Sequence, residues 1–441
     1  MRGIGRQRRL RGPVILGMAA MVAIAVGGSL AATQASAATK APAAARSGYG
    51  GLSISKQYFG STVEPYTGKE TAVYRYTLSN AEGMSVKILT YGGDLQEINV
   101  PGRNGREADV ILGFKTLQDY VTEASPPVTA NGGPYFGELI GRYGNRIANG
   151  TFTLDQPGVG PVTYHVPINN NGNSLHGGLV GFGNHIWSAK EVFGHGSVGL
   201  QLTLVSPNGD QGYPATLKDV TTFTLNNSDQ LGIHYKLTNE SSNLNTVTNV
   251  TDHAYFNLAG EASPAGSAYS QLLQINADKY TPTNLTQIPL GYHVSVFGTP
   301  FNFTTPETIG GRIDDVSAPD HAPAAYNQLL LAQGYDHNWV LNAQTPATTG
   351  PDGLNLAAKA WDPSSGRELA VWTDQPGVQV YTSNFLTGTL VGISGHTYRQ
   401  GAGYTFETQH FPNSPNQPNF PSTELGAGKT FTSTTVFAFS S

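Results

Sequence analysis

The chain has 441 residues, 12% of them charged, and its 25 basic and 30 acidic side chains give a net charge of −5 at pH 7. The acidic balance disfavours nucleic-acid binding, which needs a basic face. The sequence has no cysteine, which excludes disulfides, thiolate nucleophiles and cysteine-ligated metals. The core alone must therefore stabilise the fold, and a chain of this length can bury a sufficient one.

The first 37 residues have the three parts of a secretory signal peptide. Five arginines lie between residues 2 and 11, residues 14–30 form an apolar stretch, and Ala35-Ser36-Ala37 supplies a small-x-small cleavage site. We therefore expect cleavage after Ala37 and a secreted, extracellular protein without stable membrane association. An uncleaved N-terminal anchor is the alternative, and Arg8-Arg9 leaves open whether export uses the general or the twin-arginine route.

Cleavage would remove five of the 25 basic residues and no acidic residue, which leaves 20 against 30 and a net charge of −10. Such an acidic extracellular protein suits a neutral small-molecule partner. Residues 38–50 are rich in Ala, Ser, Lys and Pro without periodicity, and we expect them to form a flexible leader. No second linker of this kind follows, so residues 51–441 are expected to form one domain.

Hydrophobic and polar residues alternate with period 2 in many short segments, the pattern of half-buried strands. The clearest segments are residues 72–78, 86–91, 200–205, 231–237, 368–373, 378–382 and 430–437. The 54 glycines and 27 prolines supply turns between such segments, and residues 327–333 allow at most a turn or two of helix. The sequence therefore predicts an all-β fold, a large antiparallel β-sandwich with few short helices.

Two strand-like segments carry a histidine and a carboxylate that together could perform acid–base chemistry. His253 lies in the aromatic-rich segment 249–258, and Glu407 follows Phe406 and precedes Pro412. Apolar neighbours would desolvate the Glu407 carboxylate and raise its pKa toward that of a useful general base. For each residue alone, an exposed strand glutamate and a structural histidine are the commoner interpretations.

Opening of a sugar hemiacetal requires such a pair. A base removes the proton of the anomeric hydroxyl while an acid protonates the ring oxygen, and closure reverses the roles. Neither a metal nor a nucleotide cofactor is needed. This hypothesis expects His253 and Glu407 on opposite sides of the sugar, about one pyranose width apart in a shared cleft.

Further residues could bind the hydroxyls of a sugar. His176 precedes two glycines that allow close backbone approach, Arg146 offers a fork of donors, and Asp336 could accept from two hydroxyls. A turn histidine, a surface arginine and an Asx-turn aspartate are the structural alternatives. The aromatic residues with ring faces suited to a sugar, each more often a core residue, are Trp339, Tyr381 and Phe411.

A catalytic metal is disfavoured. Asp252-His253 and Asp336-His337 are adjacent pairs, and adjacent side chains on a strand point to opposite faces. His-x-His and His-Glu-x-x-His do not occur in the sequence, so we expect no metal and no cofactor. A Ser-His-Asp hydrolase is also disfavoured because the Gly-x-Ser-x-Gly elbow is missing.

Nine segments, in this order, closely resemble the aldose 1-epimerase (galactose mutarotase) family. They are residues 89–93, 141–147, 173–178, 212–214, 249–258, 299–303, 335–338, 377–385 and 407–421. The resemblance implies a galactose mutarotase-like supersandwich and interconversion of the anomers of free aldoses such as glucose or galactose. It implies that Glu407 is the general base and His253 the acid toward the ring oxygen.

The same resemblance implies a set of substrate-binding residues, which are Asn145, Arg146, His176, Asp336 and Gln379. The family usually has Gly-Arg-Val-Ala-Asn-Arg-Ile, whereas this chain has Tyr143-Gly144 before the Asn-Arg pair. Residues 122–133 and 344–353 look like loop insertions, and both are expected to alter the rim of the pocket and the substrate preference.

The sequence thus predicts an isomerase, an aldose 1-epimerase. The alternative is a secreted carbohydrate-binding β-sandwich without turnover, which would keep Arg146 and Asp336 but has no need of a Glu–His pair. An enzyme for phosphorylated sugars would need a basic cluster, and basic residues near these motifs are few. A glycosidase would need two acids across the bond, for which only Glu407 and Asp336 are candidates. The preferred aldose and the oligomeric state are left open.

Overall fold

The computed structural model describes residues 46–47, 49–124 and 133–441. The predicted signal peptide at residues 1–37 and residues 38–45 and 48 of the predicted leader at 38–50 lie outside the described residues, so both stay predictions, as does the domain boundary at residue 51. Strands dominate the described chain, and neighbouring strands of the larger sheets run antiparallel. The all-β prediction is confirmed.

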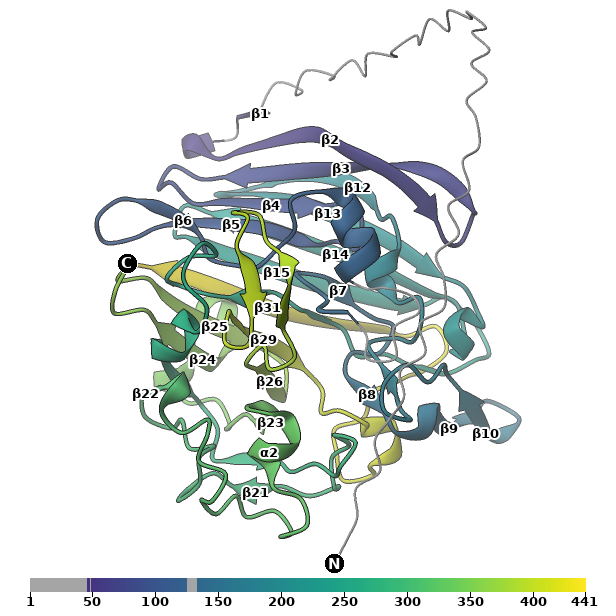
Figure 1. Ribbon diagram of the computed structural model, residues 1–441. Helices are drawn as coiled ribbons and strands as arrows, with labels where there is room; N and C mark the ends of the chain where they lie inside the picture. The colour runs from purple at the N-terminus through teal and green to yellow at the C-terminus, as the bar shows by residue number, and fades with distance from the viewer. Residues whose placement is uncertain (1–45, 48, 125–132) are drawn as a thin grey trace, which may run out of the picture. The chain divides into compact units, whose positions relative to one another are not determined.

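Three larger sheets make up most of the fold (Figure 1). The first sheet contains, in spatial order, β1 (Arg46–Ser47), β2 (Ser53–Glu64), β3 (Lys69–Ser79), β4 (Ser85–Leu89), β5 (Leu95–Pro101) and β6 (Glu107–Asp109). The second sheet contains β12 (Ser188–Gly194), β13 (Ser197–Ser206), β14 (Leu217–Asn226), β15 (Gln230–Asn239), β31 (Thr430–Ser440), β25 (Glu368–Thr373), β24 (Asn355–Trp361), β19 (Leu272–Ile275) and β22 (Glu307–Thr308). The third sheet contains β18 (Tyr255–Phe256), β29 (Tyr404–Gln409), β26 (Gly377–Tyr381), β23 (Asp336–Val340), β20 (Lys279–Thr281) and β21 (Val294–Ser295).

Short two-stranded pairings supplement these sheets in the described part of the chain. They join β7 (Leu139–Ile140) to β17 (Thr251–Asp252), β8 (Arg146–Ile147) to β11 (Ser174–Leu175), β9 (Thr151–Gln156) to β10 (Gly160–His165), β16 (Thr246–Val247) to β30 (Glu424–Leu425), and β27 (Thr387–Val391) to β28 (Thr397–Arg399). Each segment whose alternation predicted a strand overlaps a strand of the first, second or third sheet, although 86–91 and 378–382 extend past the ends of β4 and β26.

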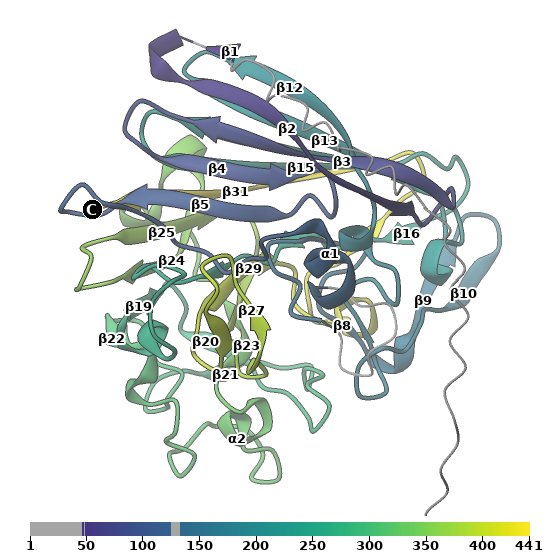
Figure 2. The ribbon, with the colours of Figure 1, turned by 45° about the horizontal axis from the view of Figure 1, so that its top comes forward.

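The first sheet lies against the second, and one core cluster continues into the third (Figure 2). Val86 and Ile88 on β4 and Leu200 and Leu202 on β13 are fully buried in this cluster, together with Val380 on β26. Burial of a side chain of this size stabilises the fold by ~1.5–3 kcal/mol. Along β4 and most of β13 buried side chains alternate with more exposed ones, whereas β26 is buried throughout. The sandwich prediction is confirmed.

Helices are few and short. The helix expected within residues 327–333 is α2 (Gln328–Ala332), and the side chain of Asn327 caps its N-terminus. A second helix, α1 (Leu117–Asp119), continues into one π-helical turn over Tyr120–Ala124. It was not predicted, because so short a segment carries no helical periodicity. Within the described residues, no helix has the length and apolar character needed to cross a membrane.

Candidate active site

Three neighbouring strands of the third sheet carry the two predicted carboxylates and the predicted glutamine. In their register Gln379 on β26 lies opposite both Glu407 on β29 and Asn338 on β23. Since side chains alternate between the faces of a strand, Asp336, two residues before Asn338, shares that face with Glu407. Phe406 points the other way, into the core. One face of this sheet is thus apolar, and the other presents the functional groups.

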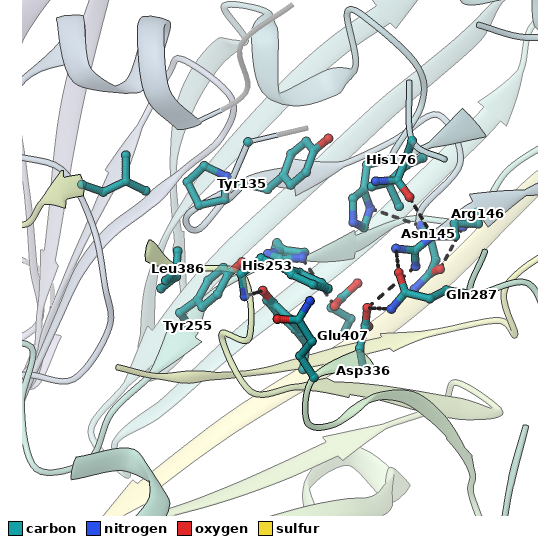
Figure 3. A pocket seen from close by; sticks show the side chains of 18 of the residues that line it. Tyr135, Asn145, Arg146, His176, His253, Tyr255, Gln287, Asp336, Leu386 and Glu407 are labelled. Atoms are coloured by element: carbon teal, nitrogen blue, oxygen red, sulfur yellow. Dashed lines mark hydrogen bonds and ion pairs between the residues drawn. The ribbon is translucent and has the colours of Figure 1, made fainter. Parts of the chain in front are cut away.

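His253 lies in the gap between β17 and β18, where the chain crosses from the β7 pairing to the third sheet. Its N–H donates to the carbonyl of Glu138 at 3.0 Å, and its carbonyl accepts from the N–H of Gly137 at 3.2 Å. Because β18 pairs with β29, the imidazole arrives beside the carboxylate of that strand. His253 Nε2 lies 3.4 Å from Oε1 of Glu407 (Figure 3).

The expected separation of one pyranose width between His253 and Glu407 is therefore wrong, because the two groups are nearly in contact. The anomeric hydroxyl and the ring oxygen of an aldose are both bonded to C1. Groups that exchange protons with these two oxygens need be no farther apart than neighbouring hydrogen-bond partners, and they approach the sugar from one side.

Asn145 and His176 form a reciprocal pair beside the short β8–β11 pairing. Both residues have left-handed backbones, with φ of 61° and 50°, which asparagine and histidine adopt more readily than most residues. The N–H of His176 donates to the carbonyl of Asn145, and the N–H of Asn145 donates to Nδ1 of His176, both at 3.2 Å. The second bond places the ring proton on Nε2, so His176 is a hydrogen-bond donor toward the cavity.

Arg146 and Asp336 are connected through a residue that the sequence did not predict, Gln287. Nη2 of Arg146 donates to Oε1 of Gln287 at 2.6 Å, and Nε2 of Gln287 donates to Oδ2 of Asp336 at 2.7 Å (Figure 3). The direct distance from Nη1 of Arg146 to Oδ2 of Asp336 is 3.9 Å. Nε2 of Gln379 donates to Oδ1 of Asp336 at 2.7 Å, so each carboxylate oxygen accepts one amide N–H.

Burial controls the ionisation of the candidate catalytic groups. Loss of water raises the pKa of Glu407 to about 8, and the negative charge of Asp336 adds to the rise. Loss of water lowers the pKa of His253 to about 4. It also lowers the pKa of His176 well below its usual range, with the charges of His253 and Arg146 contributing. Near pH 7 the His253–Glu407 pair therefore holds one proton, which leaves one group able to donate and the other able to accept.

These groups line a cavity of about 590 Å³. Six of the seven predicted site residues contribute to its wall: Asn145, Arg146, His176, His253, Asp336 and Glu407. The seventh, Gln379, is 3% exposed and does not line the cavity. Its predicted contact with substrate stays a prediction, and its link to the site in this structure is the hydrogen bond to Asp336.

Of the three aromatic candidates, only Tyr381 lines the cavity. Trp339 lies three residues after Asp336 on β23, hence on the opposite, core-facing side of the strand, and is fully buried. Phe411 follows the end of β29 and packs edge-on against Phe420. The predictions for these two residues are wrong. The aromatic rings that line the cavity belong to Tyr135, Tyr255, Tyr381 and Phe385.

The two predicted insertions differ in their relation to the cavity. The first, residues 122–133, borders it through Glu123 and Gly133, and its residues 125–132 lie outside the described part of the chain. The second, residues 344–353, forms two short 3₁₀ turns between β23 and β24, and none of its residues lines the cavity. The expectation that the second insertion shapes the pocket rim is wrong.

His176, His253 and Glu407 also offer three donor atoms within 4.8 Å of one another, a ligand set that zinc accepts. Nδ1 of His176, however, already accepts a hydrogen bond from the backbone N–H of Asn145, so its Nε2 carries the ring hydrogen and has no lone pair for a metal. Metal-bound histidines usually donate their second N–H to an oxygen, whereas Nδ1 of His253 has no hydrogen-bond partner among the described residues. The tautomers suit proton transfer better than metal binding.

Comparisons with known proteins agree with this geometry. The family model described as aldose 1-epimerase matches residues 74–438. Galactose mutarotase of Rattus norvegicus is 37% identical over 369 residues, which cover 84% of this chain and 94% of that protein. Aldose 1-epimerase of Escherichia coli (strain K12) is 30% identical over 365 residues, 82% of this chain and 94% of that protein. The crystal structure of galactose 1-epimerase from Lactobacillus acidophilus NCFM superposes with a TM-score of 0.70 at 26% identity and covers 88% of this chain and 99% of that chain. The chain therefore belongs to the aldose 1-epimerase family.

Proposed function

We propose that this protein is an isomerase that interconverts the α and β anomers of free aldoses such as glucose or galactose, an aldose 1-epimerase. The observation that carries the proposal is the buried His253–Glu407 pair, 3.4 Å apart in the wall of a polar cavity. The names of the relatives, galactose mutarotase and aldose 1-epimerase, support the same reaction.

In the proposed mechanism Glu407 takes the proton of the anomeric hydroxyl, His253 gives a proton to the ring oxygen, and the bond from C1 to that oxygen breaks. The open-chain aldehyde rotates about C1–C2. Reverse transfers then close the ring on the other face of C1 and return each proton to its starting group. The cycle balances in atoms and charge, so we propose that neither a metal nor another cofactor takes part.

Substrate binding would set the roles of the two groups. Burial favours the neutral forms of both, so before binding the shared proton rests on Glu407. A sugar hydroxyl that donates to this carboxyl stabilises its ionised form. The proton then moves to His253, 3.4 Å away, which leaves a base at the anomeric hydroxyl and an acid at the ring oxygen.

The remaining polar groups of the cavity would hold the other sugar hydroxyls. His176 offers its Nε2–H, Arg146 offers the N–H groups of Nη1, and Asp336 offers a second lone pair on each oxygen. Asn145 also lines the cavity, and its backbone N–H fixes the tautomer of His176. We propose these four residues as the substrate-binding set.

Polarimetry tests the proposal. Freshly dissolved α-glucose and α-galactose should approach their equilibrium rotation faster with the protein than in buffer alone. Methyl α-galactoside has no anomeric hydroxyl whose proton could be removed, so its rotation should stay constant. Rates equal to buffer for every sugar in a panel that adds arabinose and xylose would contradict the proposal.

A sugar-binding module without turnover is the second candidate function. Arg146 and Asp336 would serve it equally well. The His253–Glu407 pair, 3.4 Å apart, would not, because hydroxyl binding without turnover requires no proton transfer. Measurable sugar binding without any acceleration of mutarotation would favour the module.

We also propose that the protein is secreted after cleavage following Ala37. Support comes from the arginine-rich start, the apolar stretch and the small-residue cleavage site. Mass spectrometry of protein recovered from the culture medium should find Ala38 as the first residue. A protein that keeps residues 1–37 and sediments with membranes would favour the anchor instead.

A further inference from the structure

Gln287 is presented to the cavity by a tightly held loop between β20 and β21. The residue is 7% exposed and has a left-handed backbone with φ of 61°. Its N–H donates to the carbonyl of Asn284 at 2.9 Å. The side-chain oxygen of Asn284 accepts the N–H groups of Thr286 and Ile288 at 2.9 and 3.1 Å. The loop thus fixes the direction of the Gln287 side chain before any ligand binds.

Neighbouring segments hold this loop from outside. Nδ2 of Asn173 donates to the carbonyl of Thr286 at 3.2 Å, and Nε2 of Gln417 donates to the carbonyl of Pro289 at 3.4 Å. A non-glycine residue keeps a left-handed conformation only where its surroundings enforce it. Here the surrounding hydrogen bonds hold the carboxamide of Gln287 between Arg146 and Asp336.

We propose that Gln287 is a positioning residue of the epimerase, which holds Arg146 and Asp336 apart so that each keeps hydrogen-bonding capacity for sugar hydroxyls. This inference rests on the proposed function. In this inference the role of Gln287 is to set the distance between Arg146 and Asp336.

The hydrogen bonds of Arg146 show what the spacing preserves. Its Nε donates to Oδ1 of Asn170 at 3.1 Å, and its Nη2 donates to Gln287 at 2.6 Å. At 3.9 Å, Nη1 is too far from Asp336 for a hydrogen bond. Both N–H groups of Nη1 therefore remain available to a ligand in the cavity.

Without the carboxamide, the guanidinium and the carboxylate would close on each other. Arginine and carboxylate groups form bidentate pairs when nothing separates them, and only a small shift of Arg146 is needed from the present 3.9 Å. In such a pair the N–H groups of Nη1 would donate to Asp336 and would no longer be available to sugar hydroxyls. Hydroxyl binding would weaken although both residues were still present.

The spacing also affects Glu407. The charge of Asp336 raises the pKa of Glu407, and the charge of Arg146 lowers it. If Arg146 closed on Asp336, the positive charge would cancel more of the negative one, and the pKa of Glu407 would fall. Gln287 therefore contributes to the ionisation of a group that it does not touch.

Three variants of the protein with a mature N-terminus test the inference by polarimetric kinetics on α-galactose between pH 4 and pH 10. Gln287→Met keeps the length of the side chain without its hydrogen bonds. It should lower kcat/KM about tenfold, mainly through KM, and should move the alkaline limb of the pH profile to lower pH. Gln287→Glu keeps an acceptor for Arg146 but places a second carboxylate beside Asp336, so its alkaline limb should move to higher pH.

Gln417→Met is the matched control, because it removes a hydrogen bond to the same loop without touching Arg146 or Asp336. It should keep parental KM and the parental pH profile. Equal losses in Gln287→Met and Gln417→Met would overturn the inference, since the loop would then need only anchoring. Parental KM and an unmoved alkaline limb in Gln287→Met, or in Gln287→Glu should the first variant not fold, would also overturn it. An inactive parent protein would refute the proposed function itself, which separates the two failures.

Discussion

Loss of contact with water changes the ionisation of Glu407 and His253 in opposite directions. A carboxylate loses more hydration than a carboxylic acid, so burial raises the pKa of Glu407, and an imidazolium loses more than an imidazole, so burial lowers the pKa of His253. The pair consequently keeps one proton over a broad pH range. A pair with one proton contains an acid and a base at once, which ring opening requires.

His253→Asn should lower kcat for mutarotation about 100-fold. Asparagine keeps a neutral polar side chain at this position but cannot carry the proton to the ring oxygen. Some activity should remain because the His176 ring lies 5.1 Å from that of His253 and offers Nε2–H. The measurement is the initial change of rotation of fresh α-galactose at saturating sugar, and a parental kcat would refute His253 as the acid.

The pH dependence of kcat/KM should be bell-shaped. Below the acid limb both groups are protonated and no base remains. Above the alkaline limb the pair has lost its last proton and no acid remains. With the pKa of His253 lowered to about 4 and that of Glu407 raised to about 8, the plateau should lie between these values. A rate that still rises through pH 9 would be inconsistent with a one-proton pair.

Sequence patterns predicted most of the residues that gather in the cavity but not the hydrogen bonds between them. Glu407 and His253 were found as polar residues within aromatic strands. Gln287 lies in a loop without motif or period, so no sequence signal could have placed it between Arg146 and Asp336. The prediction for Trp339 could have been avoided from the sequence alone. Trp339 comes three positions after Asp336, and an odd offset along one strand places two side chains on opposite faces.

At the scale of elements, the turn that follows β11 determines where His176 lies. A Cβ at Gly177 would meet the carbonyl oxygen of Gly141 at 2.0 Å, and φ is 90°. Gly177→Ala should therefore push the turn away from Gly141, lower the apparent Tm by several degrees and reduce kcat/KM at least about tenfold.

Gly172→Ala is the matched control for the same turn region. Gly172 also has a left-handed backbone, with φ of 81°, but a Cβ there would meet nothing within 4 Å. Alanine at this position should introduce backbone strain but no steric clash, and kcat/KM should stay parental. Equal losses of activity in both variants would contradict the role assigned to the contact between Gly177 and Gly141.

Long strands were predictable and the shortest ones were not. β13 and β15 have ten residues each, enough for alternation to be recognised. β8, β11 and β17 have two residues each, and a period cannot be read from two positions. These short strands deliver Asn145, His176 and His253, so the elements nearest the candidate chemistry were those that the sequence described least.

At the scale of the whole molecule, the site exists because three sheets share one core. Residues from 145 to 407 converge on one face of the third sheet, whose other face is fixed by the core cluster. Alternation predicted the sandwich, and the ordered family motifs predicted its type. Neither could give the distances across the cavity, which depend on how the strands of different sheets pack.

The core also contains a carboxyl group that the proposed chemistry does not use. Asp94 is fully buried, and within the described part of the chain neither of its oxygens has a hydrogen-bond partner. Burial, with the charges of Glu138 and Asp252, raises the pKa of Asp94 well above its usual range. The folded state therefore binds the proton of the Asp94 carboxyl more tightly than the unfolded state, in which the pKa of an aspartate is about 4. The contribution to stability is full below that pH and is lost as pH rises through the folded pKa.

Asp94→Asn should remove this dependence. The apparent Tm of the variant should exceed that of the parent by about 2 °C or more at pH 8, and the difference should vanish toward pH 4. Differential scanning calorimetry at both pH values measures it. A lower Tm for Asp94→Asn at pH 8 would show that the ionised carboxylate is stabilised in the folded protein after all.

The most direct test of the acid–base pair is the rate at which Glu407→Gln brings fresh α-galactose to its equilibrium rotation. Glutamine keeps the shape of the side chain and an acceptor for the Thr405 hydroxyl, which lies 3.2 Å from Oε1, but it cannot take a proton. Glu368→Gln, which changes an exposed strand glutamate, is the active control. With Glu407→Gln the rotation should change at the rate seen in buffer alone, while the Tm of the variant stays near or above the parental value. A decay as fast as that of the parent protein would contradict the account.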